Sequence, residues 1–171
     1  MSDTKQDYET PPELFEACAR RFGRYGIDLA ANATNTKCRD FLTLNDECDS
    51  LITSWNSQLN ATSESSDIYW LRGWLNCPFG DSNIWTRKCA EEARLGARIT
   101  LLTQAKPGTV WFRKHVVPYA DVYFLTDRIQ FVGTPHPFPL ECIVADYNPG
   151  RRRPPCFWGW KKDVITEWGT T

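Results

Sequence analysis

The sequence predicts a three-layer α/β fold built on a mainly parallel sheet, and three observations favour it. Of the 171 residues, 42% are hydrophobic and 24% are charged, which is the composition of a globular domain. Segments with strand character alternate with segments of helical periodicity along most of the chain. One of these segments, residues 99–102, is almost entirely apolar, as expected of a strand buried on both faces of a sheet.

The first predicted helix covers residues 11–22. Thr10 is suited to the N-cap, the two prolines after it suit a first turn, and Glu13 completes a capping box. Apolar residues then recur at nearly helical spacing until two glycines end the run. A short strand is predicted next, over residues 25–30.

The middle of the chain supplies most of the remaining predicted elements. Residues 56–67 are rich in Ser and Asn with few apolar anchors, and we expect a mobile surface loop there. Residues 149–160 fit no regular element. Apolar patterns predict strands at 68–75, 99–102, 122–125 and 142–145, and helices at 84–95 and 110–117.

Charge is unevenly distributed along the chain. The formal net charge is only -1, from 20 Lys and Arg against 21 Asp and Glu, which excludes a uniformly basic coat for nucleic acid. Residues 147–171, however, hold five Lys and Arg and two Asp and Glu, a net of +3. We therefore expect residues 1–146 to form the main domain and 147–171 a basic, Trp-rich extension packed on it. Arg151, Arg152 and Arg153 are either a contact for a polyanion or a solvated tail.

Cysteine usage and hydropathy indicate a reduced, cytoplasmic protein. The seven cysteines form no Cys-x-x-Cys pair, so neither a disulfide framework nor a zinc site is predicted. The first residues are polar, and no apolar stretch approaches the length of a membrane span. We expect no metal and no membrane partner.

Two strand ends carry polar side chains, and ligands of open α/β sheets bind outside the carboxyl ends of strands. The first is Asp28 to Asn32, and the second is Asn76-Cys77-Pro78-Phe79. In the second, an amide oxygen and the next carbonyl can accept hydrogen bonds from an exocyclic amine, while an aromatic ring offers a stacking face. A turn that merely ends a strand is the simpler interpretation of so short a motif.

The order of motifs resembles the phage- and prophage-encoded Dam-like DNA N6-adenine methyltransferase family over residues 7–146. That resemblance makes residues 1–146 a methyltransferase-like domain of the class I (Rossmann-like) type. It implies transfer of a methyl group from S-adenosylmethionine to the N6 amine of adenine in double-stranded DNA, on a flipped base. The segments that carry it are Asp7-Tyr8-Glu9-Thr10-Pro11-Pro12, Asp28-Leu29-Ala30-Ala31, Lys37-Cys38, Asn76-Cys77-Pro78-Phe79, Trp111-Phe112 and Phe124-Leu125 with Arg128.

The resemblance also implies roles for individual residues. Asn76 Oδ1 and the Cys77 carbonyl would accept hydrogen bonds from the amine. Pro78 would make the turn rigid, and Phe79 after it would stack on the base. DNA would meet Arg128 and the three arginines 151–153. S-adenosylmethionine would lie against Tyr8, Thr10, Pro11, Asp28 and Ala30, with Asp46 or Asp49 on its ribose. The family suggests a monomer or homodimer in the host cytoplasm that protects phage DNA from restriction.

Cys77 departs from the family pattern, which has proline at this position. A backbone carbonyl is retained, but the fixed φ of proline is lost. Three alternatives therefore stay open: methylation of another exocyclic amine or a modified base, a catalytically lapsed relative that binds DNA or a partner, and a thiolate mechanism at carbon 5 of a pyrimidine. Cys-Pro is the reverse of the Pro-Cys order that the last of these uses.

Overall fold

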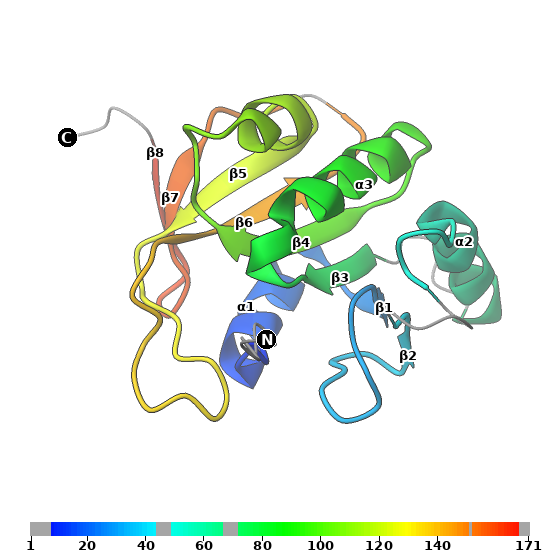
Figure 1. The fold of residues 1–171 in the computed structure, drawn as a ribbon, viewed down its shortest axis with the longest axis horizontal. Helices are drawn as coiled ribbons and strands as arrows, with labels where there is room; N and C mark the ends of the chain where they lie inside the picture. The colour runs from blue at the N-terminus through cyan, green and yellow to red at the C-terminus, as the bar shows by residue number, and fades with distance from the viewer. Residues whose placement is uncertain (1–7, 44–48, 67–71, 151, 168–171) are drawn as a thin grey trace, which may run out of the picture.

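The computed structural model describes residues 8–43, 49–66, 72–150 and 152–167. Within them, one eight-stranded sheet has the order β2-β1-β3-β4-β6-β5-β7-β8 (Figure 1). Its strands are β1 (Tyr25–Asp28), β2 (Asp40–Phe41), β3 (Arg72–Asn76), β4 (Ile99–Gln104), β5 (Ala120–Leu125), β6 (Cys142–Tyr147), β7 (Cys156–Gly159) and β8 (Val164–Glu167). The helices are α1 (Pro12–Phe22), α2 (Trp55–Ser66) and α3 (Ser82–Arg94), with a 3₁₀ turn η1 (Phe79–Asp81) and a π-helical turn η2 (Phe112–Val116).

The sheet is mixed, so the predicted three-layer, mainly parallel fold of the class I methyltransferase (Rossmann-like) type is wrong. Strands β2, β1, β3 and β4 run parallel, as do β5 and β7. The longest ladders are antiparallel, because β6 pairs with β4 over six residues and with β5 over five. A parallel neighbour needs a crossover connection that is usually helical. The described chain between β5 and β6 contains no helix, and β6 accordingly returns in the opposite direction.

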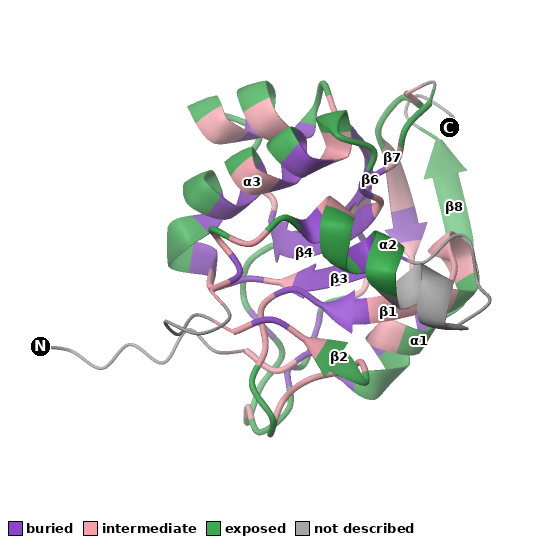
Figure 2. Cartoon of the chain, turned by 90° about the vertical axis from the view of Figure 1, so that its right-hand side faces the viewer, coloured by how far each residue is buried: buried purple, intermediate pink, exposed green. Residues whose placement is uncertain are grey.

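Each face of the sheet carries its own hydrophobic core. Helices α2 and α3 and the turn η2 cover one face, where Trp55, Trp85 and Phe112 are buried. Helix α1 and the loop 126–141 cover the other face. Figure 2 shows β3 and β4 buried between these layers, whereas β8 at the sheet edge is exposed.

Side chains of β3 alternate between the two cores, as those of any strand do. Trp74 packs with α1, and Leu75 packs with the residues of α2 and α3. Asn76 therefore lies on the α1 face, and Cys77 lies in the core of the opposite face. This alternation separates the amide of the Asn-Cys-Pro-Phe turn from its thiol.

A buried ion pair closes the opposite end of these strands. Arg72 begins β3, and its Nη1 lies 2.5 Å from Oδ1 of Asp146 in β6. Both side chains are less than 10% exposed. Burial raises the pKa of Asp146 to about 6, and the guanidinium opposes that rise.

Most predicted elements are confirmed, and three local predictions are wrong. Residues 149–160, expected to fit no regular element, contain strand β7. The predicted helices at 11–22 and 84–95 correspond to α1 and α3, and the strands at 99–102, 122–125 and 142–145 correspond to β4, β5 and β6. The predicted strand at 68–75 is described only from Arg72 onward. Residues 56–66 form most of α2 instead of a mobile loop, because Trp55 and Leu59 bury one side of that helix against the sheet. Pro11, not Thr10, is the N-cap of α1.

Candidate active site

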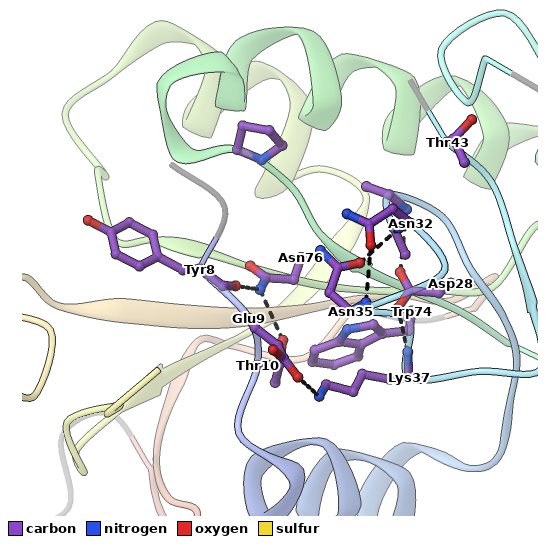
Figure 3. Close-up of a pocket in the computed structure, with 13 residues that line it drawn as sticks. Tyr8, Glu9, Thr10, Asp28, Asn32, Asn35, Lys37, Thr43, Trp74 and Asn76 are labelled. Atoms are coloured by element: carbon purple, nitrogen blue, oxygen red, sulfur yellow. Dashed lines mark hydrogen bonds and ion pairs between the residues drawn. The ribbon is translucent and has the colours of Figure 1, made fainter. Parts of the chain in front are cut away.

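A polar pocket opens at the carboxyl ends of β1 and β3. Its volume is about 320 Å³, within the range of small-molecule sites. The first described residues of the chain form one wall, and the segment after β1 forms another (Figure 3). The polar pocket is lined by Tyr8, Glu9, Thr10, Asp28, Ala30, Ala31, Asn32, Asn35, Lys37, Thr43, Trp74, Asn76 and Pro78.

The Asn76 amide is held in one orientation. Its Nδ2 donates to the Tyr8 carbonyl and, over 3.0 Å, to Thr10 Oγ1. Both acceptors lie on the same side, so the nitrogen is directed toward the N-terminal segment and Oδ1 lies on the other side of the amide (Figure 3). A preset acceptor at a strand end is suited to bind an N–H donor.

Asp28, the last residue of β1, is a buried carboxylate that faces the same pocket. Its oxygens accept hydrogen bonds from the backbone N–H groups of Lys37, at 3.0 Å, and Ala30, at 3.4 Å. Burial raises its pKa to about 6, while those two N–H groups and the Lys37 charge oppose the rise. The ammonium of Lys37 instead pairs with Glu9 Oε1 at 2.7 Å. These three ionised side chains sum to one negative charge, which favours a ligand that carries a positive charge.

The turn after β3 divides its side chains between the two faces of the sheet. Cys77 is only 2% exposed and lies in the core with Trp85 and Cys89, and burial raises the pKa of its thiol. A protonated thiol sealed in that core is no nucleophile for a ligand in the pocket. Pro78, by contrast, lines the polar pocket.

Phe79 lies in an aromatic cluster on the α1 face. Its ring centroid is 5.8 Å from that of Tyr8 and 5.5 Å from that of Phe138, and Phe131 lies 6.0 Å away. A second cavity, here the aromatic hollow, opens beside these rings with a volume of about 140 Å³. It is lined by Tyr8, Phe79, Gly80, Gln104, Lys106 and Phe138. Tyr8 lines both cavities, so the polar pocket and the aromatic hollow adjoin across this ring and the turn after β3.

A third depression, here the cationic groove, runs along the start of α1. It has a volume of about 580 Å³. The Arg128 side chain at its wall is 58% exposed, and its ion-pair partner among the described residues, Glu141, lies at the limiting distance of 4.0 Å. Such a weak exposed pair leaves the guanidinium available for an anion. The cationic groove is lined by Pro11, Glu13, Arg20, Arg128, Gln130, Pro137, Trp160 and Lys161.

The loop 126–141 connects the groove with the aromatic hollow. Arg128 and Gln130 face the groove, whereas Phe131 and Phe138 belong to the aromatic cluster. The loop is held to the N-terminal segment because Val132 N donates to the Glu9 carbonyl over 3.0 Å. One short loop thus contributes to both surfaces.

The structure brings together some of the residues named from the sequence and separates others. Tyr8, Thr10, Asp28, Ala30, Asn76 and Pro78 all line the polar pocket, while Pro11 and Arg128 line the cationic groove. Asp49 does not line the pocket: its Oδ1 accepts from the Leu51 N–H at 2.8 Å, and Thr43 lines the pocket instead. Asp46 and Arg151 lie outside the described residues.

The other two arginines of the basic run make internal contacts. Arg152 donates to the backbone carbonyls of Tyr119 and Asn148. The backbone N–H of Arg153 donates to Asp121 Oδ1 at 2.9 Å. The Arg152 guanidinium also donates to the Gly150 carbonyl and lies 3.8 Å from Asp121 Oδ1, so it is a less suitable phosphate ligand than the exposed Arg128.

Sequence reasoning did not single out several residues of the pocket. Asn35 is one of them, although its position after an acidic strand end was an available signal. Asn32 closes the strand end named from the sequence, and its Oδ1 accepts from the Thr34 N–H at 2.8 Å. Trp74 and the Glu9–Lys37 pair had no such signal, because only the folded chain brings residues 9 and 37 together.

The described part of the chain shows neither a metal-binding cluster nor a membrane-spanning helix. No group of three or more His, Cys, Asp or Glu side chains is arranged there to hold a metal ion. No helix there combines the length and the apolar character needed to cross a membrane.

Over most of its length, the chain matches a family of DNA-modifying enzymes. It belongs to the DNA N-6-adenine-methyltransferase (Dam) family, whose profile matches residues 1–137, and the resemblance noted above is confirmed. A DNA N-6-adenine-methyltransferase of Escherichia phage T1 is 27% identical over 105 residues. That match covers 61% of this chain and 38% of the relative, so the chain spans well under half of the relative's length. No solved structure matches the chain significantly.

Proposed function

We propose that the protein transfers a methyl group from S-adenosylmethionine to the N6 amine of adenine in DNA. Membership of the family suggests the reaction, and one observation in the structure supports it most directly. Asn76 Nδ2 is held by the Tyr8 carbonyl and Thr10, which turns Oδ1 toward the space where an amine would approach. The acceptor is therefore oriented before any substrate binds, which is the preorganisation that such a reaction needs.

The polar pocket fits the methyl donor in charge and size. S-adenosylmethionine carries a sulfonium, an ammonium and a carboxylate, for a net positive charge, and the Glu9, Asp28 and Lys37 side chains sum to one negative charge. Asp28 has two backbone N–H partners but no side-chain cation within ion-pair distance among the described residues. We assign Asp28 to a cationic or hydroxyl group of the donor, with Tyr8, Thr10, Pro11 and Ala30 alongside.

Asp46 and Asp49 remain proposals for the donor ribose on weaker grounds. Asp49 does not line the pocket itself, but it forms an isolated β-bridge with Thr43, which does. Its carboxylate would have to give up the Leu51 N–H to bind a hydroxyl.

The residues of the turn would act on the amine by hydrogen bonding. The lone pair of the adenine amine is delocalised into the ring, which makes the amine a poor nucleophile. Asn76 Oδ1 and the Cys77 carbonyl would accept its two N–H groups and draw the nitrogen toward tetrahedral geometry. Bound S-adenosylmethionine supplies an electrophilic methyl group. The chain thus contributes orientation and electrostatic stabilisation, with Phe79 placing the base.

Phe79 could receive a base only after a rearrangement or from the side of the aromatic hollow. Its side chain is 4% exposed, and three aromatic rings surround it. A base extruded from the duplex would enter the hollow beside Phe79 and Phe138, and extrusion is how enzymes reach a base for chemistry.

The DNA backbone would lie along the cationic groove. Arg20, Arg128 and Lys161 offer charges for phosphates there, and the loop 126–141 leads from the groove to the aromatic hollow. The arginines 151–153 remain a second proposal for phosphate contact, of which Arg153 is the better placed because Arg152 is engaged by backbone carbonyls.

Labelled methyl transfer tests this function. The protein is incubated with S-adenosylmethionine labelled on the methyl group and with duplexes that contain or lack adenine, and the modified nucleosides are identified. We expect label in N6-methyladenine alone. Label in N4-methylcytosine would favour the alternative exocyclic amine. Absence of label together with no thermal stabilisation by S-adenosylhomocysteine would indicate a lapsed relative.

A further inference from the structure

We propose that Gln104 is a specificity-determining residue that reads the amino edge of the target base in the aromatic hollow. The inference rests on the proposed function and deepens it. Gln104 is the last residue of β4 and lines the hollow together with Phe79 and Phe138. No role in the family resemblance was attached to this position.

Strand register places Gln104 on the same face as the catalytic amide. Asn76 of β3 pairs with Leu102 of the parallel strand β4, and Gln104 lies two residues further along. Because side chains alternate with a period of two, Leu102 and Gln104 point to one face. Leu102 and Trp74 both pack in the core on the α1 side, which fixes that face as the one that bears Asn76 and Phe79.

The Gln104 side chain contains a buried hydrogen-bond acceptor that is not satisfied. The residue is 9% exposed, and its Oε1 is buried with no hydrogen-bond donor. Leaving a buried acceptor without a hydrogen-bond donor destabilises the folded state, so such groups are rare and call for an explanation. The terminal torsion of glutamine is soft, so the amide can turn toward the hollow that the residue lines.

The chemistry of that amide matches adenine. Glutamine pairs with adenine through two bonds, in which the oxygen accepts from N6–H and the nitrogen donates to the adjacent ring nitrogen. Guanine and thymine carry a carbonyl oxygen where adenine has its amine, and Oε1 would meet a second acceptor there. One N6 hydrogen would be shared between Gln104 and the Cys77 carbonyl, a three-centre arrangement that is common in proteins.

The test compares Gln104→Met with the wild type on three duplexes that hold adenine, 7-deazaadenine or 1-deazaadenine at the target. Methionine keeps the length of the side chain and removes both hydrogen-bonding groups. We expect kcat/KM on adenine to fall about ten- to a hundredfold, the size of one lost bidentate contact. The wild type should lose activity on the one analogue that lacks the contacted nitrogen, and Gln104→Met should show no such additional loss.

Controls separate recognition from folding. Gln104→Met should melt no lower than the wild type, since it removes an unsatisfied buried oxygen, and S-adenosylhomocysteine should stabilise both proteins equally. Gln104→Glu, which keeps acceptors but has no N–H, should also lose the sensitivity to the deaza analogue. The exposed Gln58→Met on α2 should behave as the wild type.

The experiment distinguishes failure of the Gln104 inference from failure of the proposed function. If Gln104→Met loses the same factor on all three duplexes, or loses nothing on adenine, Gln104 does not read the base and this inference fails alone. If the wild type methylates no base in any duplex, the proposed function fails and the inference falls with it.

Discussion

Two buried aspartates, one in β1 and one in β6, show how the same side chain is used in two ways. Asp28 ends β1 and faces the polar pocket, and Asp146 lies near the end of β6, which runs the other way. Burial raises both pKa values to about 6. Asp146 is matched by Arg72 at 2.5 Å, whereas the donors to Asp28 within the described part of the chain are the backbone N–H groups of Ala30 and Lys37.

The presence or absence of a cationic partner indicates which buried carboxylate is available to bind a ligand. A carboxylate matched by an internal cation is a structural element, and removing its partner leaves an uncompensated charge. A carboxylate that lacks such a cation and faces a cavity is suited to a cationic ligand.

Arg72→Met should cause the largest loss, and the loss should be one of stability. Asp146 would remain buried without a cation, which typically costs about 3–5 kcal/mol. Without Arg72 the pKa of Asp146 rises further above its unfolded value. The folded variant then takes up a proton at a higher pH than the folded wild type does. The loss should therefore be greatest at high pH, shrink as the pH falls toward about 6, and level off below that value, where Asp146 is protonated in both proteins. Thermal unfolding between pH 5 and 8 measures this, and a pH-independent loss would contradict it.

Asn76→Ala should affect chemistry and not folding. Removing one preorganised acceptor or donor at a reacting centre costs on the order of 100- to 1,000-fold in kcat. Steady-state kinetics on an adenine duplex would show the loss, while the shift in melting temperature with S-adenosylhomocysteine should stay within experimental error of the wild type. Unchanged turnover would remove Asn76 from the mechanism.

Asp28→Asn should weaken donor binding by about ten- to a hundredfold, the strength of one hydrogen bond to a charged group. The wild-type carboxylate ionises with a pKa of about 6, so its affinity for S-adenosylhomocysteine should fall as the pH drops through 6. The variant should show no such fall and should be no less stable at pH 8, because it no longer buries a charge. Calorimetric titration at several pH values measures both affinities. Asp40→Asn, an exposed change nearby in β2, serves as the matched control.

Arg128→Gln and Lys161→Gln should have the smallest effects, confined to DNA. Each lost phosphate contact should lower the slope of log affinity against log salt by about 0.9 and weaken binding a few-fold at moderate salt. Fluorescence anisotropy over a salt series would measure this, with the exposed Arg87→Gln on α3 as control. An unaltered slope in both variants would place the DNA elsewhere, with Arg153 as the next residue to change.

Periodicity and strand ends made much of this molecule predictable. The apolar runs of β4 and β6 and the amphipathic pattern of α3 were sufficient to find those elements. Asp28 and Asn76 were found because each follows an apolar strand directly. Their meeting in one pocket follows from parallel pairing of β1 with β3, which the sequence also indicated.

The errors have physical causes. Helix α2 was missed because only Trp55 and Leu59 mark its buried side among Ser and Asn residues, so tertiary contacts outweigh weak propensity. The direction of β6 was predicted wrongly because alternation of strands and helices favours parallel pairing. The lack of a helix before β6 is the feature that indicates the antiparallel direction. Gln104 gave no signal at all, since only the register with β3 shows that it shares a face with Asn76.

The hydrogen bonds from Asn76 to Tyr8 and Thr10 join the site to a segment distant in the sequence. The Asn76 amide takes its orientation from residues that precede it by 68 and 66 positions in the sequence. Residues 8–10 belong to no helix or strand. The orientation of this amide therefore depends on a segment that contributes nothing to the sheet, and a change there could alter the amide while the sheet is kept.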